Sequence, residues 1–300
     1  MRNCGLYANA GDKLMTNMFI LKKTTELRQF LMRQQEPQSE IGFVPTMGAL
    51  HEGHISLIRE SKTEGRFTIC SIFVNPAQFN NPEDFEKYPV TIEKDIEMLA
   101  TAGCDLLFLP GLQEIYPNPN EIPPHYPLGF LETVWEGKYR PGHFQGVCRV
   151  VEKLFRLTEP GHAYFGLKDY QQCMVIRRLT ELMGCTEKIN LHLCPTLREP
   201  DGLAMSSRNL RLTEAQRNTA PALYRELQAV KQQLQPGNTH VQLLEPVKRL
   251  EAAGFIPDYF GLAHAYTLEP VEIWDGTTPL VCLAAAFLGP VRLIDNLVLQ

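Results

Sequence analysis

Two histidines three residues apart, His51 and His54, stand where an apolar run gives way to a helical pattern. The run, residues 41–44, ends at Pro45, and a turn of small residues follows, which predicts a strand, a tight turn and a helix N-terminus. Such a terminus presents unpaired backbone N–H groups and the positive end of the helix dipole, which together stabilise an anion. Side chains at i and i+3 share one helix face. The stretch therefore predicts a phosphate-binding site.

Two other interpretations of the histidine pair stay open at this point. Metalloproteases bind zinc through histidines at i and i+4 in an HExxH motif, whereas this pair is spaced i and i+3 around Gly53. A chance surface pair is the second alternative. The strand and glycine-bearing turn favour a nucleotide triphosphate, because imidazoles that hydrogen-bond phosphate oxygens stabilise the charge that develops during attack at phosphorus.

Two further polar groups follow apolar stretches. Asn75 and Gln78 come directly after the predicted strand at 66–74. If these residues only form a turn, their side chains hydrogen-bond the local backbone. At the carboxyl end of a parallel strand, however, their amides can bind a hydroxyl, carboxylate or carbonyl of a small substrate. Arg140 and His143 precede a helical pattern. These two residues either cap a turn or contribute positive charge to the same pocket.

A lysine and a serine–arginine loop complete the candidate residues. Lys168 lies between a strand pattern and a helical pattern that contains Gln172, where it is either solvated or placed to neutralise a phosphate. Ser206, Ser207 and Arg208 form a polar loop after a glycine. Such residues are common in ordinary loops, but two hydroxyls and a guanidinium can also wrap a triphosphate and move with it.

The elements that must position these residues alternate between strand and helix. This alternation predicts an α/β fold whose parallel sheet is covered on both faces and binds ligands beyond the carboxyl ends of its strands. The predicted strands include residues 66–74, 104–109, 162–165 and 189–194, and the predicted helices are 24–35, 91–102, 147–157 and 169–183, with an irregular connection at 110–129.

The pattern changes after residue 194. Residues 213–216 have the spacing of a capping box, Pro221 should interrupt the helix that follows, and a second helix is expected at 241–253. Short strands are expected at 258–262, 280–287 and 291–294. We therefore expect one domain at 18–194, a second at 195–300, and residues 1–17 as an extension outside the fold.

Composition excludes several classes of protein. With 44% hydrophobic and 21% charged residues the chain is an ordinary globular one, and no apolar run approaches the roughly 20 residues of a membrane span. A net charge of −5 argues against a general nucleic-acid-binding surface. Eight cysteines without a CxxC pair indicate buried thiols in a reducing compartment, so we expect a cytoplasmic protein.

Taken together, the motifs resemble the pantothenate synthetase (pantoate–β-alanine ligase) family within the HxGH nucleotidyltransferase superfamily. The resemblance covers nearly all of residues 18–300. It is carried by Pro45-Thr46-Met47-Gly48 with the two histidines, Phe-Val-Asn-Pro-x-Gln-Phe, Arg-Pro-Gly-His-Phe, Gly-x-Lys-Asp-x-Gln-Gln, Ser-Ser-Arg-Asn, and Arg292-Leu293-Ile294-Asp295-Asn296. It implies a Rossmann-like N-terminal domain, a smaller α+β C-terminal lid domain and a homodimer.

The resemblance also implies a role for each motif. His54 would be the catalytic histidine, with His51 and Lys168 as its phosphate-binding helpers. Gln78 and Gln172 would bind pantoate, and Gln78 would also bind β-alanine. Asn75, Arg140 and His143 would support the pocket. The implied ATP site comprises Met47, Gly48, Ala49, Leu50, His51, Glu52, Gly53, His54, Gly166, Leu167, Lys168, Asp169, the backbone of Leu197, Met205, Ser206, Ser207 and Arg208. Leu167 departs from the polar or acidic residue usual in the family.

The implied reaction has two steps. The pantoate carboxylate attacks the α-phosphorus of ATP and expels pyrophosphate, and the β-alanine amine then attacks the pantoyl adenylate, releasing AMP and pantothenate. Magnesium should accompany the triphosphate without a protein ligand of its own. Two alternatives are a different HxGH adenylyltransferase and a catalytically silent nucleotide-binding regulator.

Overall fold

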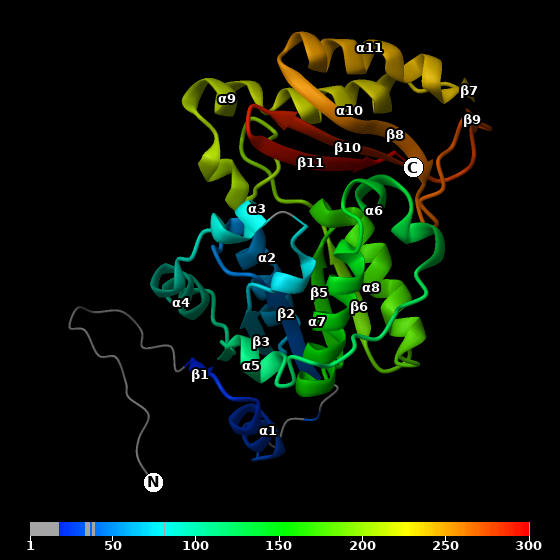
Figure 1. The fold of residues 1–300 in the computed structure, drawn as a ribbon. Coiled ribbons are helices and arrows are strands. Elements are labelled where there is room, and N and C mark those ends of the chain that lie inside the picture. Colours follow the sequence, from blue (N-terminus) through cyan, green and yellow to red (C-terminus); the bar gives the residue numbers. More distant parts are fainter. Residues whose placement is uncertain (1–17, 34–36, 38–39, 81, 300) are drawn as a thin grey trace.

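Six parallel strands form the central sheet, in the order β1-β4-β3-β2-β5-β6 (Figure 1). The structure is a computed structural model that describes residues 18–33, 37, 40–80 and 82–299. The order reverses between β2 and β5, so the carboxyl ends of these two strands flank the crevice in which such sheets bind ligands. The strands are β1 (Phe19–Leu21), β2 (Ile41–Thr46), β3 (Phe67–Ile72), β4 (Leu106–Phe108), β5 (His162–Gly166) and β6 (Asn190–Cys194).

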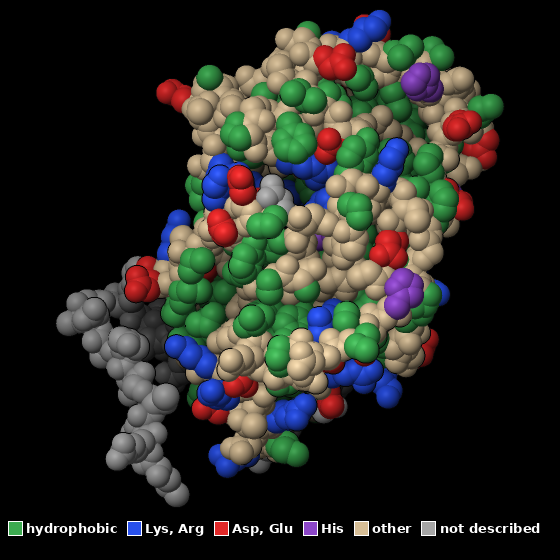
Figure 2. Space-filling view, viewed as in Figure 1, with side chains coloured by type: hydrophobic (Ala, Val, Ile, Leu, Met, Phe, Trp, Pro, Cys, Tyr) green, Lys and Arg blue, Asp and Glu red, His purple; other side chains and the backbone are tan. Residues whose placement is uncertain are grey.

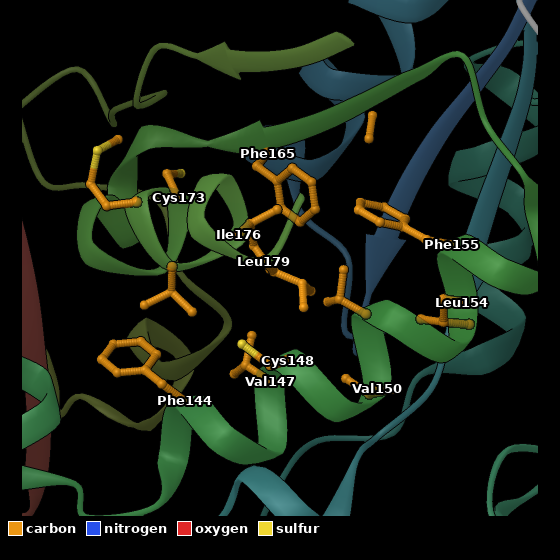
Figure 3. Packing of buried hydrophobic residues seen from close by; sticks show 14 of the residues in the cluster. Phe144, Val147, Cys148, Val150, Leu154, Phe155, Phe165, Cys173, Ile176 and Leu179 are labelled. Carbon is orange, nitrogen blue, oxygen red and sulfur yellow. The ribbon is translucent and has the colours of Figure 1, made fainter. Parts of the chain in front are cut away.

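Helices cover both faces of this sheet because neighbouring residues of each strand point to opposite sides. Val44 of β2 packs with α2 (Glu52–Thr63) and α4 (Ile92–Thr101). Phe43, the residue before it, joins the cluster of α1 (Thr24–Arg33), α7 (His143–Thr158) and α8 (Tyr170–Leu182). Figure 3 shows side chains of α7 lying against Ile176 and Leu179 of α8 and Phe165 of β5.

A second, antiparallel sheet of order β11-β10-β8 follows the parallel one. One face is covered by α10 and α11, on the side away from the parallel sheet (Figure 1). The other face contributes Val281 and Leu283 to the core of the parallel-sheet part. The elements of this part are α9 (Glu214–Thr219), α10 (Ala222–Gln233), β7 (Gly237–Asn238), α11 (Thr239–Ala252), β8 (Phe255–His264), β9 (Ile273–Trp274), β10 (Leu280–Leu288) and β11 (Val291–Val298).

The α/β fold class is confirmed: a Rossmann-like parallel sheet with a smaller C-terminal α+β part. The capping box is confirmed at the start of α9, where Thr213 and Gln216 cap each other's backbone. Pro221 does interrupt the helical stretch, since α9 ends at Thr219 and α10 begins at Ala222. The last strand of the parallel sheet, β6, ends at Cys194, next to the expected domain boundary.

Some predicted boundaries were wrong. The helix expected from residue 147 begins at His143, because Gly142 adopts a φ of 78° that ends the preceding turn and starts the helix there. The connection at 110–129 contains one short helix, α5 (Leu112–Ile115). Two short helices, α3 (Pro82–Glu86) and α6 (Trp135–Tyr139), were not predicted, because five residues are too few for a periodic pattern.

Other expectations concern the cysteines, the chain start and membranes. Every cysteine among the described residues has a free thiol, and most of these are buried. None of the helices that the structure describes is long and apolar enough to cross a membrane. The expectations for residues 1–17 and for the end of the helix predicted at 24–35 fall on residues outside those described.

Candidate active site

The turn between β2 and α2 is held by a buried carboxylate. Gly48 and Ala49 both have positive φ, 81° and 48°, which brings successive backbone N–H groups to one side of the turn. Asp95 of α4 accepts the N–H of Ala49 and that of Leu50, each at 2.9 Å. Asp95 is fully buried and also accepts the Thr91 hydroxyl. The carboxylate thus fixes the path of the chain just before the histidines.

The two histidines cap the first turn of α2 reciprocally. His51 Nδ1 accepts the backbone N–H of Gly53 at 3.1 Å, and His54 Nδ1 accepts the backbone N–H of His51 at 3.3 Å. Their rings lie side by side, with centroids 4.1 Å apart, as the i, i+3 spacing predicted. Because each Nδ1 is an acceptor, each neutral ring carries its proton on Nε2. Both imidazoles therefore offer an N–H donor beyond the helix terminus.

Both histidines are held in the neutral form. Burial, with the nearby Lys168 ammonium second, lowers the pKa of His51 to about 4. Burial, followed by the charges of His51 and Lys168, holds the pKa of His54 well below its usual value. At neutral pH the pair thus consists of hydrogen-bond donors without charge, and Lys168 supplies the cation.

Asn75 and Gln78 do lie beside the histidine turn. Gln78 Nε2 is 3.0 Å from the sulfur of Met47, and its Oε1 accepts the amide of Asn75 at 3.0 Å. Asn75 also donates to the carbonyl of Gly146 and accepts the hydroxyl of Tyr116, so its hydrogen-bonding groups are used within the protein. This geometry leaves Asn75 a supporting residue that orients Gln78.

Arg140 and His143 hold the backbone of the same loop. His143 Nδ1 donates to the carbonyl of Gln78 at 2.7 Å, while its Nε2 accepts from Arg140 at 3.1 Å. Burial, followed by the Arg140 charge, lowers the pKa of His143 to about 4. A side chain at Gly146, one turn along α7, would collide with the carbonyl of Ala77. The close packing of α7 against this loop therefore depends on the glycine at position 146.

The turn that carries Lys168 is held in place by a residue of the C-terminal sheet. Lys168 lies in a 3-10 turn, Leu167–Asp169, between β5 and α8, and its side chain is 18% exposed. Asn296 of β11 donates to the carbonyls of Leu167 and Lys168. Gln172 lies in the first turn of α8, closer to the helix start than expected, because the helix begins at Tyr170.

The serine–arginine loop reaches the histidine helix. Met205 N–H donates to the carbonyl of Leu197, and the Met205 Cβ would lie 3.7 Å from a Cβ placed on Gly53. Ser206 caps the 3-10 turn that follows. Arg208 donates to Asp84 of α3 at 2.8 Å, so this loop is tied to the parallel-sheet part.

A cavity of about 460 Å³ opens between the two sheets. This volume is within the usual range for small-molecule sites. Figure 2 shows Lys and Arg side chains gathered in the hollow between the C-terminal part and the rest of the chain. Of the predicted site residues, the cavity is lined by Arg140, Lys168, Asp169, Ser206 and Arg208.

A smaller hollow next to the cavity adds His143 and Gln172 to the lining. His51, His54 and Gln78 are absent from the described residues that line either hollow. Both histidines are nevertheless only partly buried, and Met205 of the serine–arginine loop lies close to Gly53 between them.

The family model described as pantoate-beta-alanine ligase matches residues 19–298, nearly the whole chain. The chain belongs to this family.

Relatives of the pantoate-beta-alanine ligase family match over the same length. A pantothenate synthetase of Cytophaga hutchinsonii is 42% identical, with 94% of this chain and 99% of the relative covered. One of Pseudomonas putida is 45% identical, with 94% and 98% covered.

Two solved structures of the family share the fold. The Thermus thermophilus enzyme has a TM-score of 0.85 and 41% identity, covering 94% of this chain and 100% of that one. A Francisella tularensis ligase, described as complexed with beta-gamma ATP and beta-alanine, has a TM-score of 0.77 and 37% identity, covering 94% and 97%. The resemblance inferred from the motifs is confirmed.

Sequence reasoning missed several residues that hold the ligase-family site together. Arg292 donates to Glu136 of α6 at 2.6 Å and to Asp258 of β8 at 2.6 Å, which ties the two parts of the chain. Arg292 belongs to a quoted motif but had no assigned role. Asp95 and Glu136 carried no sequence signal, because each is an isolated acidic residue whose partners are distant in the chain.

Proposed function

We propose that the chain condenses pantoate with β-alanine at the expense of ATP, through a pantoyl adenylate, releasing AMP and pyrophosphate. The observation that carries the proposal is the family match over residues 19–298 together with two neutral histidines beside Lys168 at the reversal of strand order. In the first step the carboxylate oxygen forms a bond to the α-phosphorus as the bond to the pyrophosphate oxygen breaks. In the second the amine forms the amide bond, loses a proton and displaces AMP.

The α2 terminus is the proposed ATP site. The Nε2–H groups of His51 and His54 donate to phosphate oxygens, and Lys168 neutralises charge as pyrophosphate leaves. Arg208 adds a guanidinium from the loop. The remaining proposed ATP contacts are residues 47–50, Glu52, Gly53, Gly166, Leu167, Asp169, the backbone of Leu197, and residues 205–207. None of these groups acts as a nucleophile, so catalysis here is positioning and charge stabilisation.

The pantoate site is proposed between Gln78 and Gln172, with Gln78 also facing β-alanine. Support comes from Gln78, which the Asn75 amide and the Met47 sulfur hold beside the histidine turn. The carbonyl of Gln78 is fixed in turn by His143 and Arg140. An amide so restrained can recognise a carboxylate or hydroxyl without losing much conformational entropy.

Magnesium is proposed to arrive with the nucleotide. Carboxylates that line the cavity already accept from arginine side chains, namely Asp84, Glu136, Asp258 and Asp295. Asp169 lies 3.8 Å from the Lys168 ammonium. This donor set fits an ion held by phosphate oxygens and water, which is the usual arrangement for Mg²⁺. When bound, the ion would neutralise charge on the triphosphate.

We also propose an oligomeric state, a cellular location and a domain division. The family resemblance supports a homodimer. Free thiols support a reducing, cytoplasmic location. The packing of β8, β10 and β11 as a separate sheet supports a domain at 18–194 and a C-terminal lid at 195–300.

The test is an assay of the purified chain with ATP, magnesium, pantoate and β-alanine, from which each component is omitted in turn. Pantothenate and AMP should form in equal amounts and only when all four are present. Production of AMP without pantoate, or with an amino acid in its place, would exclude the proposal.

A further inference from the structure

Two histidines and a glutamate meet at the end of the parallel sheet away from the proposed active site. His162 is the first residue of β5, His192 lies in β6, and Glu64 follows the last turn of α2. One potential ligand atom from each lies within 4.8 Å of the others. His51 and His54 are at the opposite end of α2, so this cluster belongs to no part of the site described above.

The strand register places the two histidines on one face of the sheet. His192 pairs with Tyr164, and His162 is two residues before Tyr164 on the same strand. The His192 and Tyr164 rings stack with centroids 4.4 Å apart and an interplanar angle of 18°. The imidazole of His192 is therefore held against a rigid neighbour, which lowers the entropy that a ligand would cost.

The glutamate is oriented by partners that use only one of its oxygens. The Tyr164 hydroxyl donates to Glu64 Oε2 at 2.6 Å, and Arg66 Nε donates to the same oxygen at 2.8 Å. Oε1 faces His192 Nδ1 at 3.7 Å. Partners that hold one carboxylate oxygen and leave the other aimed at imidazole are typical of the groups that surround metal ligands.

The two imidazoles share one proton. His162 Nδ1 and His192 Nε2 are 2.8 Å apart, a hydrogen bond that needs one nitrogen protonated and the other bare. A cation can take the place of that shared proton.

We propose that Glu64, His162 and His192 form a binding site for a divalent transition-metal ion, with Zn²⁺ as the best match. Two imidazole nitrogens and one carboxylate are a common zinc ligand set, with the fourth position left to water. His192 presents Nε2 to His162 and Nδ1 to Glu64, so one ion would take a single nitrogen of this ring. Ligands about 2.0–2.1 Å from a tetrahedral ion lie about 3.3 Å from one another. The facing imidazole nitrogens, 2.8 Å apart, must therefore open slightly, whereas ligand atoms that are up to 4.8 Å apart must close by about 1.5 Å. The side chain of Glu64 is 32% exposed and has room for that movement.

The neighbouring Arg66 sets a limit on the affinity. The Arg66 guanidinium lies beside Glu64 and would repel a metal ion bound there. Because the guanidinium also pairs with Glu40, part of its positive charge is neutralised. Bound metal would join the C-terminal end of α2 to β5 and β6. The expected consequence is a more stable fold, since a ligand that binds only the folded state raises its unfolding temperature.

Calorimetric titration of the EDTA-treated full chain with Zn²⁺ alone, without nucleotide, tests the proposal. We expect one ion per chain and a rise in Tm with Zn²⁺. His162→Gln and His192→Gln each remove a ligand, so they should weaken binding by more than the roughly 10–100-fold that loss of an outer partner of a metal ligand costs, and they should abolish the rise in Tm. His240→Gln, which changes an exposed histidine of α11, is the matched control and should bind like the parent.

Two further variants keep the experiment decisive. Glu64→Gln retains an oxygen for Tyr164 and Arg66, so it should stay folded while losing affinity for Zn²⁺. His51→Gln reports binding at the nucleotide site and should leave the titration unchanged. Absence of stoichiometric binding to the folded parent chain would overturn the proposal, as would Zn²⁺ binding that survives His162→Gln but is lost in His51→Gln.

Discussion

The side-chain amide of Asn296 donates to the backbone carbonyl of Lys168 at 2.9 Å and to that of Leu167 at 2.8 Å. This pair joins the last strand of the C-terminal sheet to the turn that carries the proposed phosphate-binding lysine. Asn296 is buried, and its neighbour Asp295 is held by two hydrogen bonds from Arg198. Lys168 is thus positioned by the C-terminal part as well as by its own strand.

Replacing Asn296 with alanine should therefore impair the reaction without removing any group to which we assign a contact with substrate. Loss of the two N–H donors leaves the partly buried carbonyls of Leu167 and Lys168 unpaired, which should lower the free energy of unfolding by about 1–3 kcal/mol. The turn that carries Lys168 should then shift. A misplacement of about 1 Å can cost up to about 100-fold in rate. Adenylate formation and Tm should both fall, whereas the exposed-residue control Asn120→Ala should change neither. A normal rate in Asn296→Ala would refute the positioning role.

Lys168→Ala should slow adenylate formation by about 10²–10³, because a preorganised cation near the leaving pyrophosphate is lost. The fold should persist, since the contact of the Lys168 ammonium with the described residues is a 3.8 Å ion pair with Asp169. Single-turnover pyrophosphate release measures the effect. Lys188→Ala, at an exposed lysine, serves as the control. Parent-like pyrophosphate release in Lys168→Ala would remove the lysine from the mechanism.

Gln78→Ala should raise KM for pantoate more than KM for ATP. The amide lies beside Met47 and is oriented by Asn75, at the edge of the histidine turn. Steady-state kinetics with each substrate varied in turn would separate the two effects, and Gln113→Ala provides an exposed control. An unchanged dependence on pantoate would count against this assignment.

Stability should fall as pH drops from about 6.5 to 4. The pKa of His143 is lowered to about 4, so in this window the unfolded chain binds a proton that the folded chain does not. The side chain is 5% exposed, and the shift corresponds to about 3 kcal/mol. Urea unfolding at pH 7.5 and 4.5 should show a smaller loss of stability in His143→Gln than in the parent. Identical losses would show that His143 does not stay neutral.

The local parts of the fold and site were predictable from sequence. The strand, turn and helix at 41–54 have a strong pattern, and the i, i+3 spacing correctly placed the rings of His51 and His54 together. The capping box at 213–216 depends only on neighbouring residues. Such features can be predicted because the interactions that produce them join residues that are close together in the sequence.

Contacts between distant residues could not be predicted in the same way. Asp95 holds the backbone of Ala49 and Leu50 from another helix, and Arg292 reaches Glu136 across more than half of the chain. Nothing in the sequence near an isolated acidic residue indicates which distant backbone or guanidinium it will meet. These partners become visible only when the fold brings them together.

The central claim is that the histidine helix activates the pantoate carboxylate with ATP. Isotope exchange between pyrophosphate and ATP tests it most directly, because exchange requires the first step alone. We predict exchange that needs pantoate but not β-alanine, and a fall of about 10²–10³ in His54→Ala. Exchange that proceeds without pantoate, or at the parent rate in His54→Ala, would contradict the account.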